Sequence, residues 1–148
     1  MPQLSFYVLT GKKPLLDFVC QLTQKALNQS DEGVLIVAPN NAENSLMVKL
    51  DEQLWAFSDT AFIPHQCITA TDPQQAGFLG VGLTDNLAIA EAFDGVIINL
   101  IPQALVNTLA NRVLEVIDSD EASIVQGREK YAQYRQYFPN LEIKTHKI

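Results

Sequence analysis

The sequence alternates short runs of consecutive apolar residues with segments of helical periodicity, and this alternation limits the fold more than any other feature. Residues 34–38 and 94–100 form two such runs, typical of strands buried on both faces of a parallel sheet. Residues 4–9 and 112–117 are two further strand candidates. The order of strands and helices along the chain indicates an α/β layered fold with a largely parallel sheet and helices on both faces.

The helical segments are recognised by apolar residues three and four positions apart. We expect helices from Pro14 to about residue 29, from Asn40 or Asn41 to near Trp55, and over residues 102–110. A last long helix is expected to begin after N-cap candidates at 118–120 and to end near Tyr137, before Pro139.

Residues 56–92 are expected to be a mostly irregular connection with one short strand near 78–83. No repeat, low-complexity segment or linker divides the chain, which we therefore treat as a single domain over residues 1–148.

Composition places the chain among ordinary globular proteins. Of its 148 residues 47% are apolar and 18% charged, and no apolar run approaches the roughly 20 residues that a membrane-spanning helix needs. The N-terminus lacks the basic and apolar regions of a signal peptide, and two cysteines form no disulfide framework. We therefore expect a cytoplasmic protein.

Charge is unevenly distributed. Residues 1–127 hold five basic and fifteen acidic side chains, a net charge of −10, whereas residues 128–148 hold five basic and two acidic ones, a net +3. So acidic a chain is not expected to coat nucleic acid, because phosphate binding draws on Lys and Arg. The basic end is either a solvated helix surface or a local site for an acidic partner.

Signals for nucleotide or metal chemistry are weak. Gly11-Lys12-Lys13 lacks the spacing of a phosphate-binding loop, and the glycines of residues 77–82 do not follow the dinucleotide-binding pattern. His65 and Cys67 would need Cys20 and His146 to complete a zinc site, and Cys20 lies on the apolar stripe of a helix. We predict no catalytic residue, cofactor or metal. The alternative is a small α/β enzyme or nucleotide-binding domain with its site in residues 66–92.

Two groups of residues stand out. Trp55 ends a helix and precedes Phe62, which suggests either a small core under the loop or a shallow aromatic pocket. In the last helix Ile124, Arg128, Tyr131 and Arg135 share one side, at the border of an apolar band. These arginines either lie over the apolar band or frame a pocket for an apolar group with its carboxylate.

At these groups the sequence resembles the chi subunit of bacterial DNA polymerase III, an accessory protein of the clamp loader. The resemblance extends nearly end to end, except for residues 66–92. Its most specific part is Leu-Asp-Glu-x-Leu-Trp at 50–55 with Phe-Ile-Pro-His at 62–65, supported by Phe-Tyr-Val-Leu at 6–9, Val-Leu-Ile-Val at 34–37 and Arg-Glu-Lys-Tyr-x-x-Tyr-Arg at 128–135.

The resemblance implies a Rossmann-like domain without nucleotide chemistry, which is not an enzyme itself but a subunit of a DNA-directed DNA polymerase complex. Its implied partners are the psi subunit, through which it attaches to the clamp loader, and the C-terminal tail of single-stranded DNA-binding protein. That tail is acidic, ends in apolar residues and carries a free carboxylate, and DNA would be met only indirectly. By position, the tail-binding residues are Trp55, Phe62, Ile117, Arg128, Tyr131 and Arg135.

Overall fold

The computed structural model describes residues 3–11, 14–29, 33–39, 46–56, 65–67 and 81–148. In chain order its elements are β1 (Gln3–Val8), α1 (Leu15–Gln29), β2 (Val34–Val37), α2 (Leu46–Ala56), β3 (His65–Cys67), β4 (Val81–Thr84), α3 (Leu87–Ala92), β5 (Val96–Asn99), β6 (Arg112–Ile117), α4 (Glu121–Tyr137) and β7 (Ile143–Lys147).

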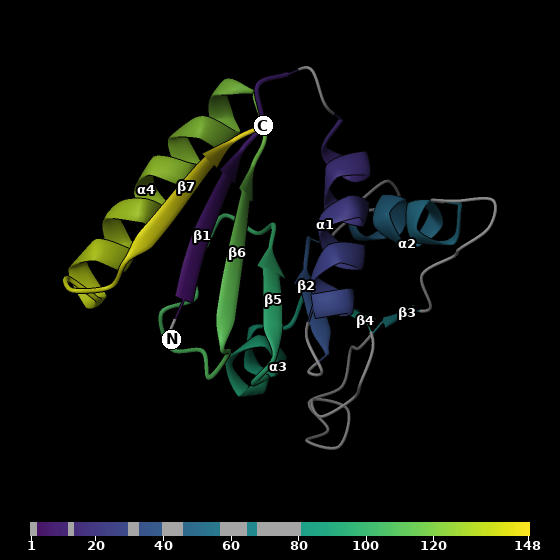
Figure 1. Cartoon of the computed structure of the whole chain (residues 1–148), viewed down its shortest axis with the longest axis horizontal. Helices are drawn as coiled ribbons and strands as arrows, with labels where there is room; N and C mark the ends of the chain where they lie inside the picture. Colours follow the sequence, from purple (N-terminus) through teal and green to yellow (C-terminus); the bar gives the residue numbers. More distant parts are fainter. Residues whose placement is uncertain (1–2, 12–13, 30–32, 40–45, 57–64, 68–80) are drawn as a thin grey trace.

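The strands form one seven-stranded sheet in the order β3-β4-β2-β5-β6-β1-β7, and every pairing in it is parallel (Figure 1). The predicted strands β1, β2, β5 and β6 therefore share one parallel sheet, as expected. The sequence did not predict the two edge strands, β3 and β7. β7 follows the last helix and pairs with β1, so β1 is not at the edge of the sheet.

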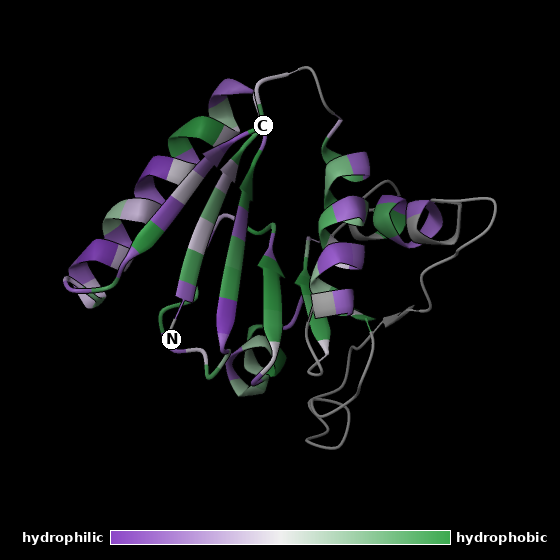
Figure 2. Ribbon diagram, in the orientation of Figure 1, coloured by the Kyte–Doolittle hydropathy of each residue, from purple (hydrophilic) through white to green (hydrophobic). Residues whose placement is uncertain are grey.

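Helices cover both faces of the sheet, which confirms the predicted three-layer arrangement. On one face α1 and α2 bury a core that includes Phe18, Val19, Ile36 and Ile98. On the other face α3 and α4 bury a second core that includes Leu35 and Ile97. The central strands β2, β4 and β5 are buried along their whole length because both faces are covered. Figure 2 shows these strands as mostly hydrophobic, whereas β7 carries hydrophilic residues.

The last helix begins where the sequence predicts. Asp120 is its N-cap, and its carboxylate accepts hydrogen bonds from the Ser123 backbone N–H at 3.0 Å and the Ser123 hydroxyl at 2.6 Å. These hydrogen bonds lower the pKa of Asp120 below its usual value, because they favour the ionised carboxylate. The helix ends at Tyr137, before Pro139, as predicted.

The helix predicted over residues 102–110 is wrong: this segment is irregular, and a short helix, α3, instead precedes β5. The irregular segment still buries Leu105 and Ala110 in the core. Its backbone bonds to side chains from elsewhere, since the Leu105 N–H donates to the Tyr134 hydroxyl at 2.9 Å and the Gln103 carbonyl accepts from Asn99 at 2.9 Å. These contacts replace the bonds that a helix would supply internally.

A buried polar network attaches α4 to the sheet. Glu115 of β6 is fully buried and accepts hydrogen bonds from Lys130 Nζ at 2.8 Å, the Tyr134 hydroxyl at 2.6 Å and Asn99 Nδ2 at 2.8 Å. Lys130, itself only 3% exposed, also donates to the Ile101 carbonyl at 3.0 Å. Burial, followed by the charge of Glu115, raises the pKa of Tyr134 far above its usual value, so its hydroxyl stays protonated and donates.

None of the helices in the described ranges is both long enough and apolar enough to cross a membrane.

We expect Glu115→Gln to lower the free energy of unfolding by about 3–5 kcal/mol, because it leaves the Lys130 ammonium buried without a counter-charge. Glu115→Gln combined with Lys130→Met should lose less than the two single variants together, since the pair is coupled. Denaturant unfolding measures these values. Glu129→Gln on the exposed side of α4 is the control, with an expected change within about 0.5 kcal/mol. A Glu115→Gln loss no larger than that of the control would show that the network does not hold α4.

Candidate functional site

An apolar cavity of about 290 Å³ lies between α4 and the sheet, and we call it the α4 groove. Its wall on the helix side comes from α4, and its floor comes from three neighbouring strands, β6, β1 and β7 (Figure 1). Its lining residues are Phe6, Val8, Ile117, Ile124, Gly127, Arg128, Tyr131 and Thr145.

Strand alternation explains the floor. Successive side chains of a strand point to opposite faces, so Phe6 and Val8 of β1 face α4 together with Ile117 of β6 and Thr145 of β7. The register places Phe6 beside Thr145, and Val8 beside Ile117. The position of β1 between β6 and β7 brings these residues to one site.

Gly127 allows α4 to approach the floor closely. It is buried, and a Cβ atom at this position would lie 2.9 Å from Ile117 Cδ1 and 3.1 Å from Ile117 Cγ1 and Cγ2. The missing side chain therefore leaves room for Ile117 beneath the helix.

Tyr131 and Arg128 form the rim of the α4 groove on the helix side. The Tyr131 ring packs on Phe6 at a centroid distance of 5.6 Å, tilted by 57°, and Tyr131 remains 38% exposed. Arg128 is exposed on the preceding turn of α4. The rim thus places a guanidinium, with its five N–H donors, beside an aromatic and aliphatic cavity.

Arg135 lies next to Tyr131 and is not among the residues that line the groove. Its Nη1 donates to the Leu141 carbonyl at 2.7 Å, its guanidinium lies 5.5 Å from the centre of the Tyr131 ring, and its Nε and Nη2 donate weakly to the Tyr131 hydroxyl at 3.4 Å. Arg135 therefore fastens the end of α4 to the segment before β7 and orients Tyr131.

The structure brings together three of the predicted site residues, Ile117, Arg128 and Tyr131, and places Arg135 beside them. Trp55 lies in the last turn of α2, which belongs to the opposite helical layer, and its side chain is outside the described part of the chain. Phe62 also lies outside the described residues.

Sequence reasoning missed the floor residues Phe6, Val8 and Thr145. A signal for Phe6 and Val8 existed in the alternation along β1, but it does not say which helix covers them.

Cys20 and the candidate metal ligands bear on whether the described part of the chain offers catalytic groups. Burial, with the nearby charge of Asp17, raises the pKa of the Cys20 thiol to about 12, so it stays protonated and is a poor nucleophile at neutral pH. The described residues contain no group of three or more His, Cys, Asp or Glu side chains suited to a metal ion, and the side chains of His65 and Cys67 are outside that set.

Open α/β sheets bind nucleotides beyond the carboxyl ends of their strands. Among the described residues, a cavity at this edge near Leu100 and Asp118 measures about 100 Å³, below the roughly 300–1,000 Å³ range of ligand pockets. Of the region proposed for the alternative nucleotide site, residues 68–80 lie outside the described residues, and the rest forms β3, β4 and α3 with short connections.

Comparison with known proteins agrees with the resemblance seen in the sequence. The model of the family described as "DNA polymerase III chi subunit, HolC" matches residues 1–140. The DNA polymerase III subunit chi of Pseudomonas aeruginosa is 30% identical over 140 residues, which cover 92% of this chain and 91% of that protein.

Gly127→Ala tests the close approach beneath α4. Replacing a helical glycine by alanine gains about 1 kcal/mol in propensity, whereas overpacking against Ile117 costs about 1–3 kcal/mol. We expect a net change in unfolding free energy from about zero to 2 kcal/mol of destabilisation. Ala132→Gly, on the exposed side of the same helix, measures the difference in helix propensity between alanine and glycine alone. It should lower the free energy of unfolding by about 1 kcal/mol. A Gly127→Ala variant stabilised by the full propensity gain would contradict a close-packed floor.

Proposed function

The chain belongs to the DNA polymerase III chi subunit family, and from this premise we propose that it acts in DNA replication as a noncatalytic bridge between the clamp loader and single-stranded DNA-binding protein. In this proposal the α4 groove binds the acidic C-terminal tail of single-stranded DNA-binding protein. The psi subunit connects the chain to the clamp loader.

The observation that carries the proposal is the position of Arg128 at the rim of an apolar groove. A peptide that ends in apolar residues and a free carboxylate needs a cavity for its side chains and a cation within reach of its terminus. The groove supplies both, with Phe6, Ile117 and Tyr131 as apolar contacts. Charge-assisted hydrogen bonds from a guanidinium to a carboxylate are among the stronger polar contacts in proteins.

The charge of the chain supports a narrow contact of this kind. An acidic peptide approaching a protein of net charge −7 is repelled except where basic residues cluster, and α4 carries Arg128, Lys130 and Arg135. Lys130 is buried against Glu115, and Arg135 is engaged with Leu141, so Arg128 is the exposed one of these three. We therefore assign the carboxylate contact to Arg128.

A bridge must hold its partners simultaneously, so in this proposal psi binds a surface apart from the α4 groove. Trp55 and Phe62 stay predictions from the resemblance. The helix that carries Trp55 lies in the other layer, and Phe62 lies outside the described residues.

We expect Arg128→Ala to weaken binding of a labelled tail peptide by about 10- to 100-fold. A hydrogen bond to a charged group contributes about 1.5–3 kcal/mol, and about 1.4 kcal/mol corresponds to a tenfold change in affinity. Arg128→Lys should recover only part of this loss, because an ammonium cannot make the paired hydrogen bonds of a guanidinium. Fluorescence anisotropy titrations measure the affinities.

Lys49→Ala is the matched control, because it removes one exposed positive charge from α2, in the opposite helical layer. It should bind the peptide within about twofold of the parent chain. Thermal unfolding verifies that each variant is folded. Parent-like binding by Arg128→Ala would refute the assignment of the carboxylate to the α4 groove.

A further inference from the structure

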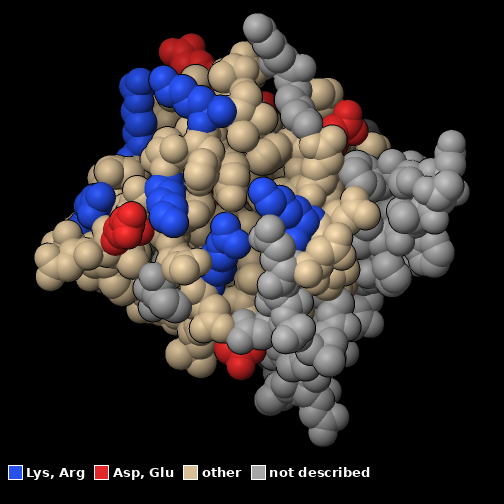
Figure 3. Space-filling model, viewed as in Figure 1, with Lys and Arg blue, Asp and Glu red and all other residues tan. Residues whose placement is uncertain are grey.

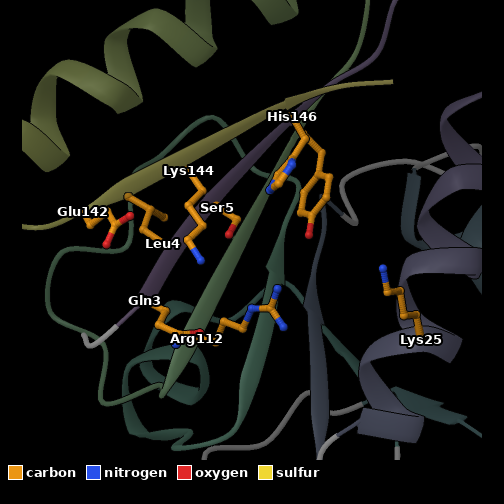
Figure 4. Close-up of a pocket in the computed structure, with 9 residues that line it drawn as sticks. Gln3, Leu4, Ser5, Lys25, Arg112, Glu142, Lys144 and His146 are labelled. Carbon is orange, nitrogen blue, oxygen red and sulfur yellow. The ribbon is translucent and has the colours of Figure 1, made fainter.

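A second cavity, of about 350 Å³, lies on the opposite face of the sheet from the α4 groove, between α1 and the strands β6, β1 and β7. We call it the β7 trough. Lys25 lines it from α1, Arg112 from β6, and Lys144 and His146 from β7 (Figure 4). Tyr7 of β1 is also among its lining residues.

The sheet register creates the trough. Tyr7 lies beside His146, and Ser5 lies beside Lys144, so alternate residues of β1 and β7 share this face. Arg112 lies beside Gln3 at the other end of β1. In Figure 1, α1 lies over the β2 side of the sheet and leaves β1, β6 and β7 open toward the viewer.

Three cationic side chains from three different elements line the trough, namely Lys25, Arg112 and Lys144. Figure 4 shows the Lys144 ammonium directed toward the Arg112 guanidinium, with Lys25 on α1 across the open space from them. The space-filling view shows basic side chains spread over this face (Figure 3). Glu142, at one end, is the carboxylate among the lining residues. In a chain of net charge −7, a cavity lined by three cations and one carboxylate differs in sign from the chain as a whole.

The Arg112 Nε atom is buried, and no atom of the described residues accepts a hydrogen bond from it. A buried donor without an acceptor is unfavourable, and most buried polar groups in proteins are satisfied. Anionic groups in the trough would supply an acceptor near this guanidinium and offset the positive charges that line it.

An aromatic stack continues into the trough. The Tyr7 ring packs on Phe18 of α1 at a centroid distance of 5.5 Å and stacks on the His146 imidazole at 4.9 Å, with an interplanar angle of 20°. His146 is exposed, so a further planar ring can extend the stack from the open side. Single-stranded nucleic acids carry both anionic phosphates and planar bases. Their bases stack on aromatic side chains of a protein, while basic residues contact the phosphates.

We propose that the β7 trough binds a short segment of single-stranded nucleic acid, with phosphates at Lys25, Arg112 and Lys144 and a base stacked on His146. An acidic peptide would use the cations but leave the ring platform without a role. The contact is weak because the rest of the chain repels a polyanion, and it becomes effective when a strand is already held nearby. The proposal goes beyond the tail-binding function and does not depend on it.

The test is binding of a labelled single-stranded oligonucleotide by fluorescence anisotropy at low and increasing salt. Three phosphate contacts predict a slope of about −2 in a plot of log affinity against log salt concentration, since each contact contributes about 0.7 for single strands. Lys144→Gln and Lys25→Gln should each reduce this slope by about 0.7 and weaken binding roughly 3- to 10-fold at low salt. His146→Ala should weaken binding about fivefold or more while leaving the salt slope unchanged.

Lys147→Gln is the matched control, because Lys147 lies on the same strand one position after His146, on the opposite face. It should bind the oligonucleotide like the parent chain. Tail-peptide binding and thermal unfolding are measured on the same variants. A variant that has lost only oligonucleotide binding keeps both, whereas a misfolded variant loses both. If Lys144→Gln does not fold, the exposed Lys25→Gln on α1 decides the outcome.

Three results would overturn the proposal. The first is equal weakening by Lys147→Gln and Lys144→Gln, which indicates nonspecific attraction. The second is equal affinity for a nucleoside monophosphate and the oligonucleotide, which indicates a site for a free nucleotide. The third is displacement of the oligonucleotide by an acidic peptide whose own binding is lost in Lys144→Gln, which indicates a peptide site.

Discussion

The buried contact between Glu115 and Lys130 determines where α4 lies, and the α4 groove depends on that position. Removing two charges from water is costly, so the pair is favourable only because further hydrogen bonds surround it. Tyr134 and Asn99 donate to Glu115, and the Ile101 carbonyl accepts from Lys130. These directional hydrogen bonds add a specific register to the apolar packing of α4 on the sheet.

That placement has consequences on both sides of Lys130 along α4. One turn toward its N-terminus from Lys130, Gly127 sits against Ile117 and brings the helix down onto the strand. Five residues toward its C-terminus from Lys130, Arg135 bonds to Leu141 and contacts Tyr131. The groove residues are therefore held by a rigid scaffold, which limits the conformational entropy lost when a peptide binds.

Much of the fold and part of the site could be predicted from the sequence. Consecutive apolar residues in β2 and β5 indicated buried parallel strands, and helical periodicity placed Arg128 and Tyr131 on one side of α4. Residues 102–110 were mispredicted because Tyr134, 29 positions from Leu105, supplies the hydrogen bond that a helix would have made locally. The strand β7 was not predicted because it is short, charged and exposed, and therefore has no run of apolar residues. Without β7, neither the full floor of the groove nor the trough could be assembled from the sequence.

The two cavities lie on opposite faces of the same three strands, and alternation along β1 divides its residues between them. Phe6 and Val8 serve the apolar groove, while Tyr7 faces the basic trough. A ligand in one cavity does not occupy the space of the other. The acidic remainder of the chain restricts both contacts to the residues that line these cavities.

The most direct test of the α4 groove is a nuclear magnetic resonance titration of the isotope-labelled chain with a tail peptide that has a free C-terminal carboxylate. The account predicts that the largest backbone shift changes fall on Ile117, Ile124, Gly127 and Tyr131, and that amidating the peptide terminus largely abolishes them. Changes centred on β7 trough residues such as Tyr7 and Lys144, or equal changes with the amidated peptide, would contradict it.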